Sequence, residues 1–322
     1  MPQTIVCLDG LTLNPGDLSW APFERIGTFQ VHDRTPAAQV VERAAAATCV
    51  LTNKTPLTAG DLANLQKLTY IGVLATGYNI VDLEAAAKHD VVVTNVPTYG
   101  TDTVAQHATA LILELVRHVY VHHLAVQRGQ WSSCDDFCFA LAPITELTGK
   151  TLGILGLGRI GRTLARIGAA MGMRLIGHDI YWPTPQQMDG LEIESLSMDE
   201  VFVQADVLSL HCPLTDQTQQ LINADRLKKM KPSALLINTS RGPLVDNQAL
   251  ADALRDGTIA GAGLDVLDVE PPPSDNPLIG VPNCIITPHI AWYAQAARQR
   301  IIDTAAENLE AFLNGNTVNQ VT

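Results

Sequence analysis

The fold of this chain is decided by Thr151-Leu152-Gly153-Ile154-Leu155-Gly156-Leu157-Gly158-Arg159-Ile160-Gly161-Arg162, in the middle of its 322 residues. The stretch begins with an apolar run typical of a buried strand, and an amphipathic segment predicted to be helical follows from Thr163 to Met171. Between the two, the glycines predict a tight turn whose backbone can approach a pyrophosphate at the helix N-terminus. The stretch therefore predicts a dinucleotide-binding loop.

An acidic residue at the right spacing strengthens this prediction. A second apolar strand is predicted from Met173 to Gly177, and Asp179 lies 18 residues beyond Gly161. A carboxylate at that place can bond both ribose hydroxyls of NAD and would repel the additional phosphate of NADP. The alternative is a plain strand-helix-strand unit whose glycines serve only packing. Strand, helix and acid together favour NAD as the cofactor.

Composition excludes several classes of protein. A chain of 322 residues with 47% apolar residues can build two domains with full cores. Its net charge of −12 argues against nucleic acid or an anionic membrane as a partner. We expect neither a membrane span nor a signal peptide, because no apolar run approaches the roughly 18 residues that a span needs.

The cysteines and histidines do not form an evident metal site. The six cysteines show no C-x-x-C pairing and lie mostly in apolar segments, so we expect reduced thiols in a cytoplasmic protein. Cys134 and Cys138 could pair or bind a metal, but no flanking histidine supports that. His118 and His122 have the i,i+4 spacing that can share a metal. Since no third ligand is evident, we predict no metal.

The chain outside the glycine loop indicates a second α/β unit. Over the first hundred residues, strands are predicted at 5–8, 28–31, 49–51, 70–74 and 91–94, with helices at 36–46, 60–65 and 81–88. This pattern is typical of an open parallel sheet. The apolar periodicity of 103–127 predicts one helix long enough to cross between domains. A last helix is predicted at 293–312, ending before Asn314-Gly315.

Three predicted strands in the second half of the chain end in polar residues. Arg241 follows the strand at 235–238, Asp265 and then Glu270 follow the strand at 261–264, and His289 follows the strand at 285–287. The carboxyl ends of strands in an open α/β sheet face the ligand crevice, so these residues could converge on a bound cofactor. Arginine clamps a carboxylate, histidine moves a proton, and a carboxylate fixes the histidine tautomer.

Each of these residues also has an ordinary structural interpretation. An arginine at a strand end is often part of a surface ion pair, and His289 could be a capped loop histidine. Glu270, beside prolines, could lie in a solvated turn. Their occurrence at three consecutive strand ends beside a nucleotide loop favours a catalytic site. Hydride transfer from a 2-hydroxy acid needs these groups and no metal.

Together these motifs resemble the D-isomer-specific 2-hydroxyacid dehydrogenases. The resemblance covers nearly the whole chain and rests on residues 156–161, 211–215, 238–242, 263–266 and 287–289. It implies an α/β fold of two doubly wound parallel-sheet domains with a cleft between them. A Rossmann-type NAD domain would cover 101–291, and a discontinuous flavodoxin-like substrate domain would cover 1–100 and 292–322. The resemblance also implies a homodimer formed through the cofactor domain.

The resemblance assigns roles to individual residues. Arg241 would bind the substrate carboxylate and C2 oxygen, and Glu270 would pair with His289, the acid/base. Asp265 would lie near the nicotinamide and Asp179 on the adenosine ribose. The residues implied in cofactor binding are Gly156, Gly158, Arg159, Ile160, Gly161, Asp179, Cys212, Pro213, Thr239, Asp265 and Thr103.

Finer signals resemble the glycerate dehydrogenases, also called hydroxypyruvate reductases. They lie at 74–82, 131–139 and 289–292. In that group the turn at Thr76-Gly77 offers backbone N–H groups to the substrate carboxylate. The residues implied in substrate binding are Thr76, Gly77, Arg241, Lys54 and Trp292. For Tyr78 and Trp292, core packing at a hinge is an equal alternative.

We therefore expect an NAD-dependent enzyme that interconverts hydroxypyruvate and D-glycerate, with glyoxylate and glycolate as a further pair. The alternatives are another D-2-hydroxyacid dehydrogenase of the family and a non-enzymatic, NAD-sensing corepressor-like protein. Formate oxidation would not need a histidine tuned as a base. A phosphorylated substrate would need several cations, whereas the loop at 51–55 provides only Lys54.

Overall fold

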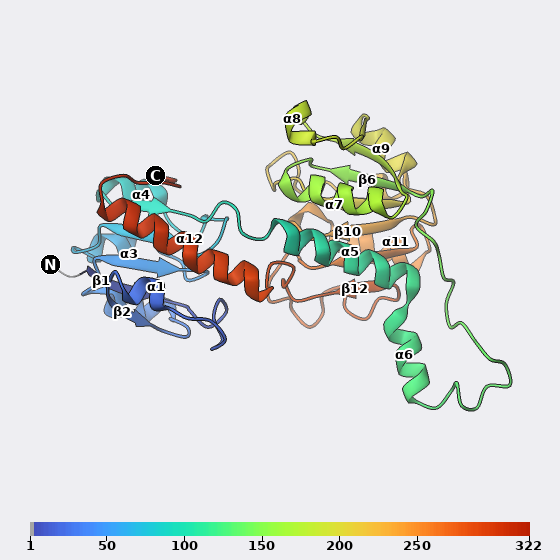
Figure 1. The fold of residues 1–322 in the computed structure, drawn as a ribbon, viewed down its shortest axis with the longest axis horizontal. Coiled ribbons are helices and arrows are strands. Elements are labelled where there is room, and N and C mark those ends of the chain that lie inside the picture. Colours follow the sequence, from blue (N-terminus) through green and yellow to red (C-terminus); the bar gives the residue numbers. More distant parts are fainter. Residues whose placement is uncertain (1–2) are drawn as a thin grey trace. The chain divides into compact units, whose positions relative to one another are not determined.

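The computed structural model describes residues 3–322, which form two compact units (Figure 1). The first unit contains the described residues up to Gly100 together with Trp292–Thr322, and the second contains Thr101–Ala291. Within the described residues, no helix combines the length and the apolar character needed to cross a membrane.

The first unit is built on a five-stranded parallel sheet with the strand order β2-β1-β3-β4-β5. This order is that of a doubly wound sheet, in which the chain first builds outward on one side and then on the other. The strands are β1 (Gln3–Cys7), β2 (Gly27–Val31), β3 (Cys49–Thr52), β4 (Tyr70–Val73) and β5 (Val92–Thr94).

Helices cover both faces of this sheet. Successive residues of a strand point to opposite faces, so each strand contributes apolar side chains to both layers of helices. The helices are α1 (Ala21–Glu24), α2 (Val40–Ala44), α3 (Ala59–Asn64), α4 (Leu83–Lys88) and α12 (Gln295–Leu313). Ile5 and Leu51 pack with Ile301 and Leu309 of α12 in one apolar cluster. Val6, Val50 and Ile71 pack against α2, α3 and α4 in another. The last helix of the chain thus completes the first unit.

The second unit contains a seven-stranded parallel sheet with the strand order β12-β11-β10-β9-β6-β7-β8. The order reverses between β6 and β9, and in such sheets ligands bind at the carboxyl ends of the strands beside this reversal. The strands are β6 (Thr151–Leu155), β7 (Arg174–His178), β8 (Glu194–Ser195), β9 (Val207–Leu210), β10 (Leu235–Asn238), β11 (Gly261–Leu264) and β12 (Cys284–Ile286).

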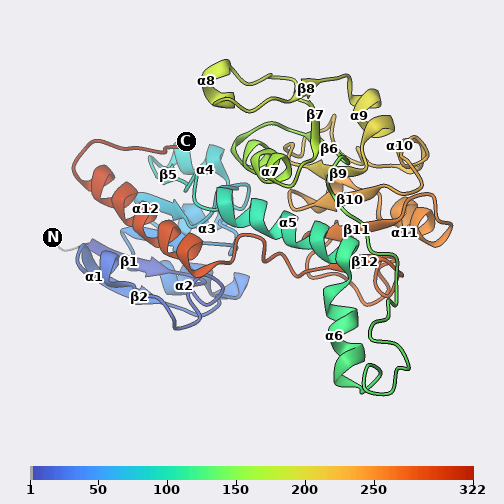
Figure 2. The same cartoon turned by 45° about the vertical axis from the view of Figure 1, so that its right-hand side comes forward.

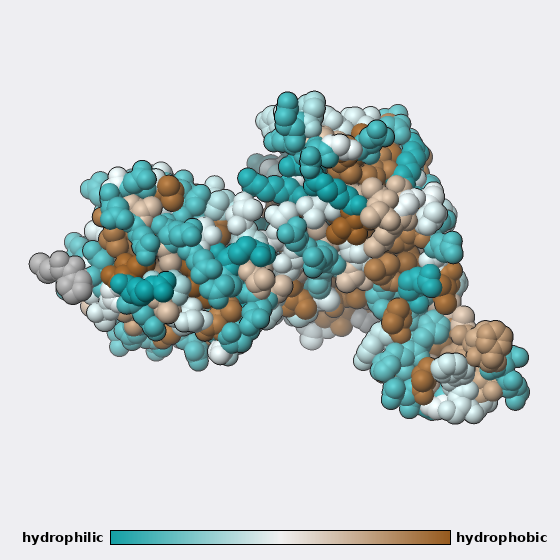
Figure 3. Space-filling model, in the orientation of Figure 1, coloured by the Kyte–Doolittle hydropathy of each residue, from teal (hydrophilic) through white to brown (hydrophobic). Residues whose placement is uncertain are grey.

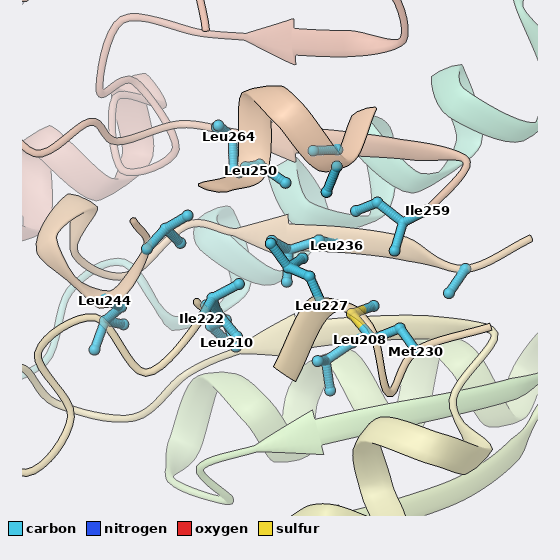
Figure 4. Packing of buried hydrophobic residues seen from close by; sticks show 14 of the residues in the cluster. Leu208, Leu210, Ile222, Leu227, Met230, Leu236, Leu244, Leu250, Ile259 and Leu264 are labelled. Atoms are coloured by element: carbon cyan, nitrogen blue, oxygen red, sulfur yellow. The ribbon is translucent and has the colours of Figure 1, made fainter. Parts of the chain in front are cut away.

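Two apolar layers enclose the second sheet. Its helices are α5 (Thr101–Arg117), α6 (Val119–Gln127), α7 (Arg159–Ala170), α8 (Pro185–Met188), α9 (Met198–Gln204), α10 (Ala224–Leu227) and α11 (Asn247–Arg255). Leu235 and Ile237 of β10 lie in the cluster formed with α5 and α7. Leu236, between them, points to the other face, toward Leu227 and Leu250 of α10 and α11 (Figure 4). The prediction of two parallel α/β units is confirmed.

The prediction of one continuous helix over 103–127 is wrong. The segment forms α5 and α6, separated by His118, whose backbone is left-handed with φ of 52°. The left-handed residue turns the chain, and Glu114 caps the new helix by accepting a hydrogen bond from Tyr120 N over 3.1 Å. The apolar periodicity of the sequence continues across His118, so the pattern does not indicate the break between the two helices. Figures 1 and 2 show α6 and the segment after it extending from the rest of the second unit.

Other predicted boundaries shift by a few residues. The helix expected at 36–46 begins as a 3-10 turn, Ala37–Gln39, and continues as α2. The helix expected from Thr163 begins at Arg159, directly after the glycine loop, and the final helix begins at Gln295. These differences follow from the weak signals that mark helix ends in a sequence.

Candidate active site

The glycine loop connects β6 to α7 and shows the geometry expected of a phosphate-binding turn. Gly156 has a φ of +96°, and a Cβ there would lie 2.5 Å from His211 C. A Cβ on Gly161 would lie 2.1 Å from Gly156 O, so only glycine allows this loop to pack on the helix. A Cβ on Gly158 would meet nothing within 4 Å. The space over Gly158, the N-cap of α7, therefore fits a pyrophosphate.

Asp179, just beyond the end of β7, fastens the glycine loop. Its Oδ2 accepts a hydrogen bond from Leu157 N over 2.5 Å, and its Oδ1 accepts one from Tyr181 N over 2.9 Å. Arg162 of α7 donates to Leu157 O over 2.5 Å. Leu157 is thus held on both its N–H and its carbonyl. The half-buried carboxylate lies beside the loop, where a ribose-binding acid is needed.

The segment after β9 closes the other side of the loop. Burial lowers the pKa of His211 to about 4 and raises the pKa of the Cys212 thiol to about 11, so both groups are neutral at pH 7. Ser209 Oγ lies 2.8 Å from His211 Nε2. After the next strand, the buried Thr239 Oγ1 has no hydrogen-bond partner among residues 3–322. Such a hydroxyl fits a site that a ligand completes.

The turn after β10 that carries Arg241 is organised by the buried side chain of Asn238. Asn238 Oδ1 accepts a hydrogen bond from Ser240 N over 3.0 Å, and Asn238 Nδ2 donates to Arg241 O over 2.9 Å. Ser240 Oγ also donates to Leu210 O of the neighbouring strand β9 over 2.7 Å. The turn is fixed, and the Arg241 side chain is exposed beyond it. The guanidinium is therefore available for an anion.

Glu270 and His289 form a hydrogen-bonded pair beyond the carboxyl ends of β11 and β12. Glu270 Oε2 lies 2.6 Å from His289 Nδ1, and Glu270 Oε1 accepts a hydrogen bond from Leu267 N over 3.0 Å. An ionised carboxylate makes Nδ1 the protonated nitrogen and leaves Nε2 as the nitrogen that exchanges a proton. About a third of each side chain is exposed, so a small molecule can reach the pair.

Asp265 is buried inside the turn before His289. Its side chain is 1% exposed and accepts hydrogen bonds from Ile290 N and Ala291 N over 2.9 and 2.8 Å. Thr287 Oγ1 donates to the same carboxylate over 2.6 Å, and His107 Nε2 lies 2.9 Å from Thr287 Oγ1. Thr287 lies in the motif at 287–289, but the sequence assigned it no role and did not single out His107.

The first unit holds a second group of predicted site residues at the carboxyl ends of its own strands. Thr76, beyond β4, donates through Oγ1 to Val96 O over 2.9 Å and accepts from Asn95 Nδ2 on its carbonyl over 2.8 Å. Asn53 Nδ2 donates to Leu74 O over 2.9 Å. The Thr76-Gly77 turn is therefore braced from the strands on both sides.

Two further predicted residues of this unit have defined surroundings. Lys54 N donates to Asp9 Oδ2 over 2.6 Å, which fixes the backbone of its loop. Trp292 packs edge-on against Tyr99 and Tyr293, with ring centroids 6.2 and 5.4 Å apart, and touches the apolar core. Across residues 3–322, no cluster of three or more histidine, cysteine or acidic side chains could hold a metal ion, and all six cysteines are free.

Comparison with known proteins agrees with this geometry. The family model of the D-isomer-specific 2-hydroxyacid dehydrogenase NAD-binding domain matches residues 109–291. The chain is 45% identical to the hydroxypyruvate reductase of Blautia hydrogenotrophica, covering 98% of this chain and 99% of that protein. It is 41% identical to the glycerate dehydrogenase of Methylorubrum extorquens, covering 88% of each.

A solved structure extends the match to the whole fold. The TT0316 protein of Thermus thermophilus superposes with a TM-score of 0.86 at 35% identity, covering 99% of this chain and 100% of that one. The chain belongs to the D-isomer-specific 2-hydroxyacid dehydrogenase family, and its second unit carries the NAD-binding domain of that family. The resemblance in the sequence motifs is thereby confirmed.

Proposed function

We propose that this protein interconverts hydroxypyruvate and D-glycerate with NAD(H), and that it also accepts glyoxylate and glycolate. The observation that carries the proposal is the 2.6 Å contact between Glu270 Oε2 and His289 Nδ1. It lies on the NAD-binding unit, one strand from the Arg241 turn. A histidine held by a carboxylate suits a reaction in which a carbonyl oxygen gains or loses a proton. The names of the two relatives point to the same pair of compounds.

The residues around the glycine loop would hold the cofactor. The pyrophosphate would lie over Gly158, at the N-terminal turn of α7 that carries Arg159 and Ile160. The carboxylate of Asp179 would take the adenosine ribose. The remaining cofactor contacts would come from Cys212, Pro213, Thr239, Asp265 and Thr103. When bound, NAD(H) supplies or accepts the hydride of the reaction.

Arg241 and His289 would act on the two polar ends of the substrate. The planar guanidinium of Arg241 would bind the carboxylate through two N–H groups and polarise the C2 oxygen. In the reductive direction, protonated His289 gives its Nε2 proton to that oxygen as the hydroxyl forms. Glu270 stabilises the imidazolium before the transfer and keeps the ring oriented. In the oxidative direction, neutral His289 removes the hydroxyl proton.

We further propose that the first unit, 1–100 with 292–322, is the substrate-binding domain. The braced turn at Thr76-Gly77 would offer backbone N–H groups to the substrate carboxylate. Lys54 would add a positive charge, and Trp292 would form an apolar wall. These contacts suit a small acid with one carboxylate, because a phosphorylated substrate needs several cations.

We propose a cytoplasmic homodimer assembled through the second unit. The segment around α6 exposes large apolar side chains, as Figure 3 shows for one face. These side chains are Val119, Tyr120, Val121, Val126, Trp131, Phe137, Leu141 and Ile144. Exposed apolar groups gathered on one projection are typical of a protein interface. The free cysteines suit a reducing compartment.

An NADH-oxidation screen tests the proposed activity. The purified chain is mixed with NADH and, in turn, hydroxypyruvate, glyoxylate, pyruvate, 2-oxoglutarate and phosphohydroxypyruvate. We expect the highest kcat/KM for hydroxypyruvate, a lower value for glyoxylate, and far lower values for the two substrates with a second anionic group. Faster reduction of phosphohydroxypyruvate or pyruvate than of hydroxypyruvate would contradict the assignment.

A further inference from the structure

His289 has a backbone conformation that the surrounding residues must enforce. Its φ is 55°, in the left-handed region, which a residue with a side chain adopts only where the surrounding structure holds it there. His289 N donates to Asp265 O over 2.8 Å and to Thr287 O over 3.0 Å. The unusual conformation therefore depends on the residues that hold this turn.

The buried carboxylate of Asp265 holds the turn on both sides of His289. It accepts Thr287 Oγ1 before the histidine, and Ile290 N and Ala291 N after it. One fixed carboxylate thus determines the path of the chain from 287 to 291. A displacement of Asp265 would move the His289 ring with the backbone.

His107 of α5 completes this arrangement from a different element. Its Nε2 lies 2.9 Å from Thr287 Oγ1 and 3.4 Å from Asp265 Oδ1, and its side chain is 20% exposed. The single hydroxyl proton of Thr287 is donated to Asp265, so the hydroxyl can only accept from His107. His107 Nε2 must therefore carry a proton. His107 thus donates to Thr287, and Thr287 donates to the buried carboxylate of Asp265.

We propose that His107 is a positioning residue for His289, acting through Thr287 and Asp265. The inference rests on the acid/base role proposed for His289. An acid/base must be held close to its productive geometry, since small displacements reduce proton transfer. The His107 hydrogen bond fixes the Thr287 rotamer, Thr287 fixes Asp265, and Asp265 fixes the turn. The identity of residue 107 should consequently affect kcat although its side chain is bonded to Thr287 rather than to His289.

A double-mutant cycle tests the proposal. Thr287→Val keeps the shape and removes the hydroxyl, and His107→Leu removes the donor. We expect each variant to lower kcat about tenfold, the effect of one buried hydrogen bond, with KM changed less than about twofold. The double variant should be no slower than the slower single variant, because both changes interrupt the same series of hydrogen bonds from His107 through Thr287 to Asp265. Thr287→Ser should restore most of kcat, and His107→Gln should restore part of it.

Two controls separate positioning from folding. Thr109→Val, on the same helix, removes a buried hydroxyl that donates to Ala105 O over 2.8 Å and should leave kcat unchanged. In protein with 15N-labelled histidine, the His289 ring signals, assigned with His289→Ala, should move in Thr287→Val and His107→Leu but not in Thr109→Val. Thermal melting of each variant reports its folding.

The inference would be overturned if Thr287→Val had the kcat of the wild type. It would also be overturned if the reductions in kcat of the two single variants multiplied in the double variant. Unmoved His289 signals in folded Thr287→Val or His107→Leu protein would also reject it. The spectra do not depend on turnover. If the wild type reduced no 2-oxo acid while the signals still moved, the proposed function would fail and the coupling would stand.

Discussion

Each unit has a buried aspartate beyond the carboxyl end of a parallel strand, and its carboxylate accepts hydrogen bonds that fix a loop. The two loops carry different residues. In the first unit, the buried carboxylate of Asp9 accepts hydrogen bonds from three successive N–H groups, those of Asn53, Lys54 and Thr55, over 2.6–2.8 Å. In the second unit, the buried carboxylate of Asp265 accepts the N–H groups of residues 290 and 291 and the hydroxyl of Thr287.

What differs is the residue that each carboxylate holds in place. Asp9 fixes a loop that carries a lysine, and through the hydrogen bond from Asn53 to Leu74 O it braces the segment before the Thr76-Gly77 turn. Asp265 fixes a turn that carries a histidine already paired with Glu270. On the proposed function, the same kind of rigid support would serve substrate binding in one unit and proton transfer in the other. Variants in the first unit should mainly change KM or stability, and variants in the second should mainly change kcat.

The largest effect is expected from removing the acid/base. His289→Ala should lower kcat for hydroxypyruvate reduction by roughly 10²–10⁴-fold, the usual contribution of general acid–base catalysis. NADH binding, followed by the fluorescence of the bound cofactor, should be retained because the glycine loop is unaffected. A kcat within a few-fold of the wild type would show that proton transfer does not pass through this residue.

The matching change in the first unit should act on stability. Asp9→Ala leaves three backbone N–H groups without their acceptor and should lower the free energy of unfolding by about 2–4 kcal/mol. Urea titration of the variant and the wild type measures the difference. Asp61→Ala, which removes a half-buried helix-capping carboxylate from the same unit, is the control and should cost only about 1 kcal/mol. Equal losses in both variants would contradict the supporting role of Asp9.

A smaller effect is expected at the cofactor site. Asp179→Asn removes the charge that would repel a 2′-phosphate, so the preference for NADH over NADPH should fall by about tenfold or more. The ratio of kcat/KM for the two cofactors at matched concentrations measures this. Asp216→Asn, an exposed acid of the same unit, should leave the ratio unchanged. A wild type that uses NADPH as well as NADH would reject the role of Asp179.

The sequence predicted the features with strong local signals and missed those that depend on tertiary contacts. The glycine loop and the strand ends at Arg241 and His289 could be predicted because parallel strands bring their carboxyl ends together. The break at His118 could not, because a single left-handed residue leaves the apolar periodicity intact. The contact between His107 and Thr287 joins residues 180 positions apart, and although Thr287 lies in the motif at 287–289, no local pattern links it to His107.

The most direct test of the central claim is the pH dependence of kcat for reduction, measured for the wild type and Glu270→Gln. Reduction needs protonated His289, so kcat should fall as pH rises. Without the negative charge 2.6 Å from its ring, the imidazolium is less stable. We predict that kcat of Glu270→Gln falls at lower pH than kcat of the wild type, with part of the activity kept at acidic pH. Superimposable profiles would contradict the account, because they would show that this carboxylate does not act on the catalytic histidine.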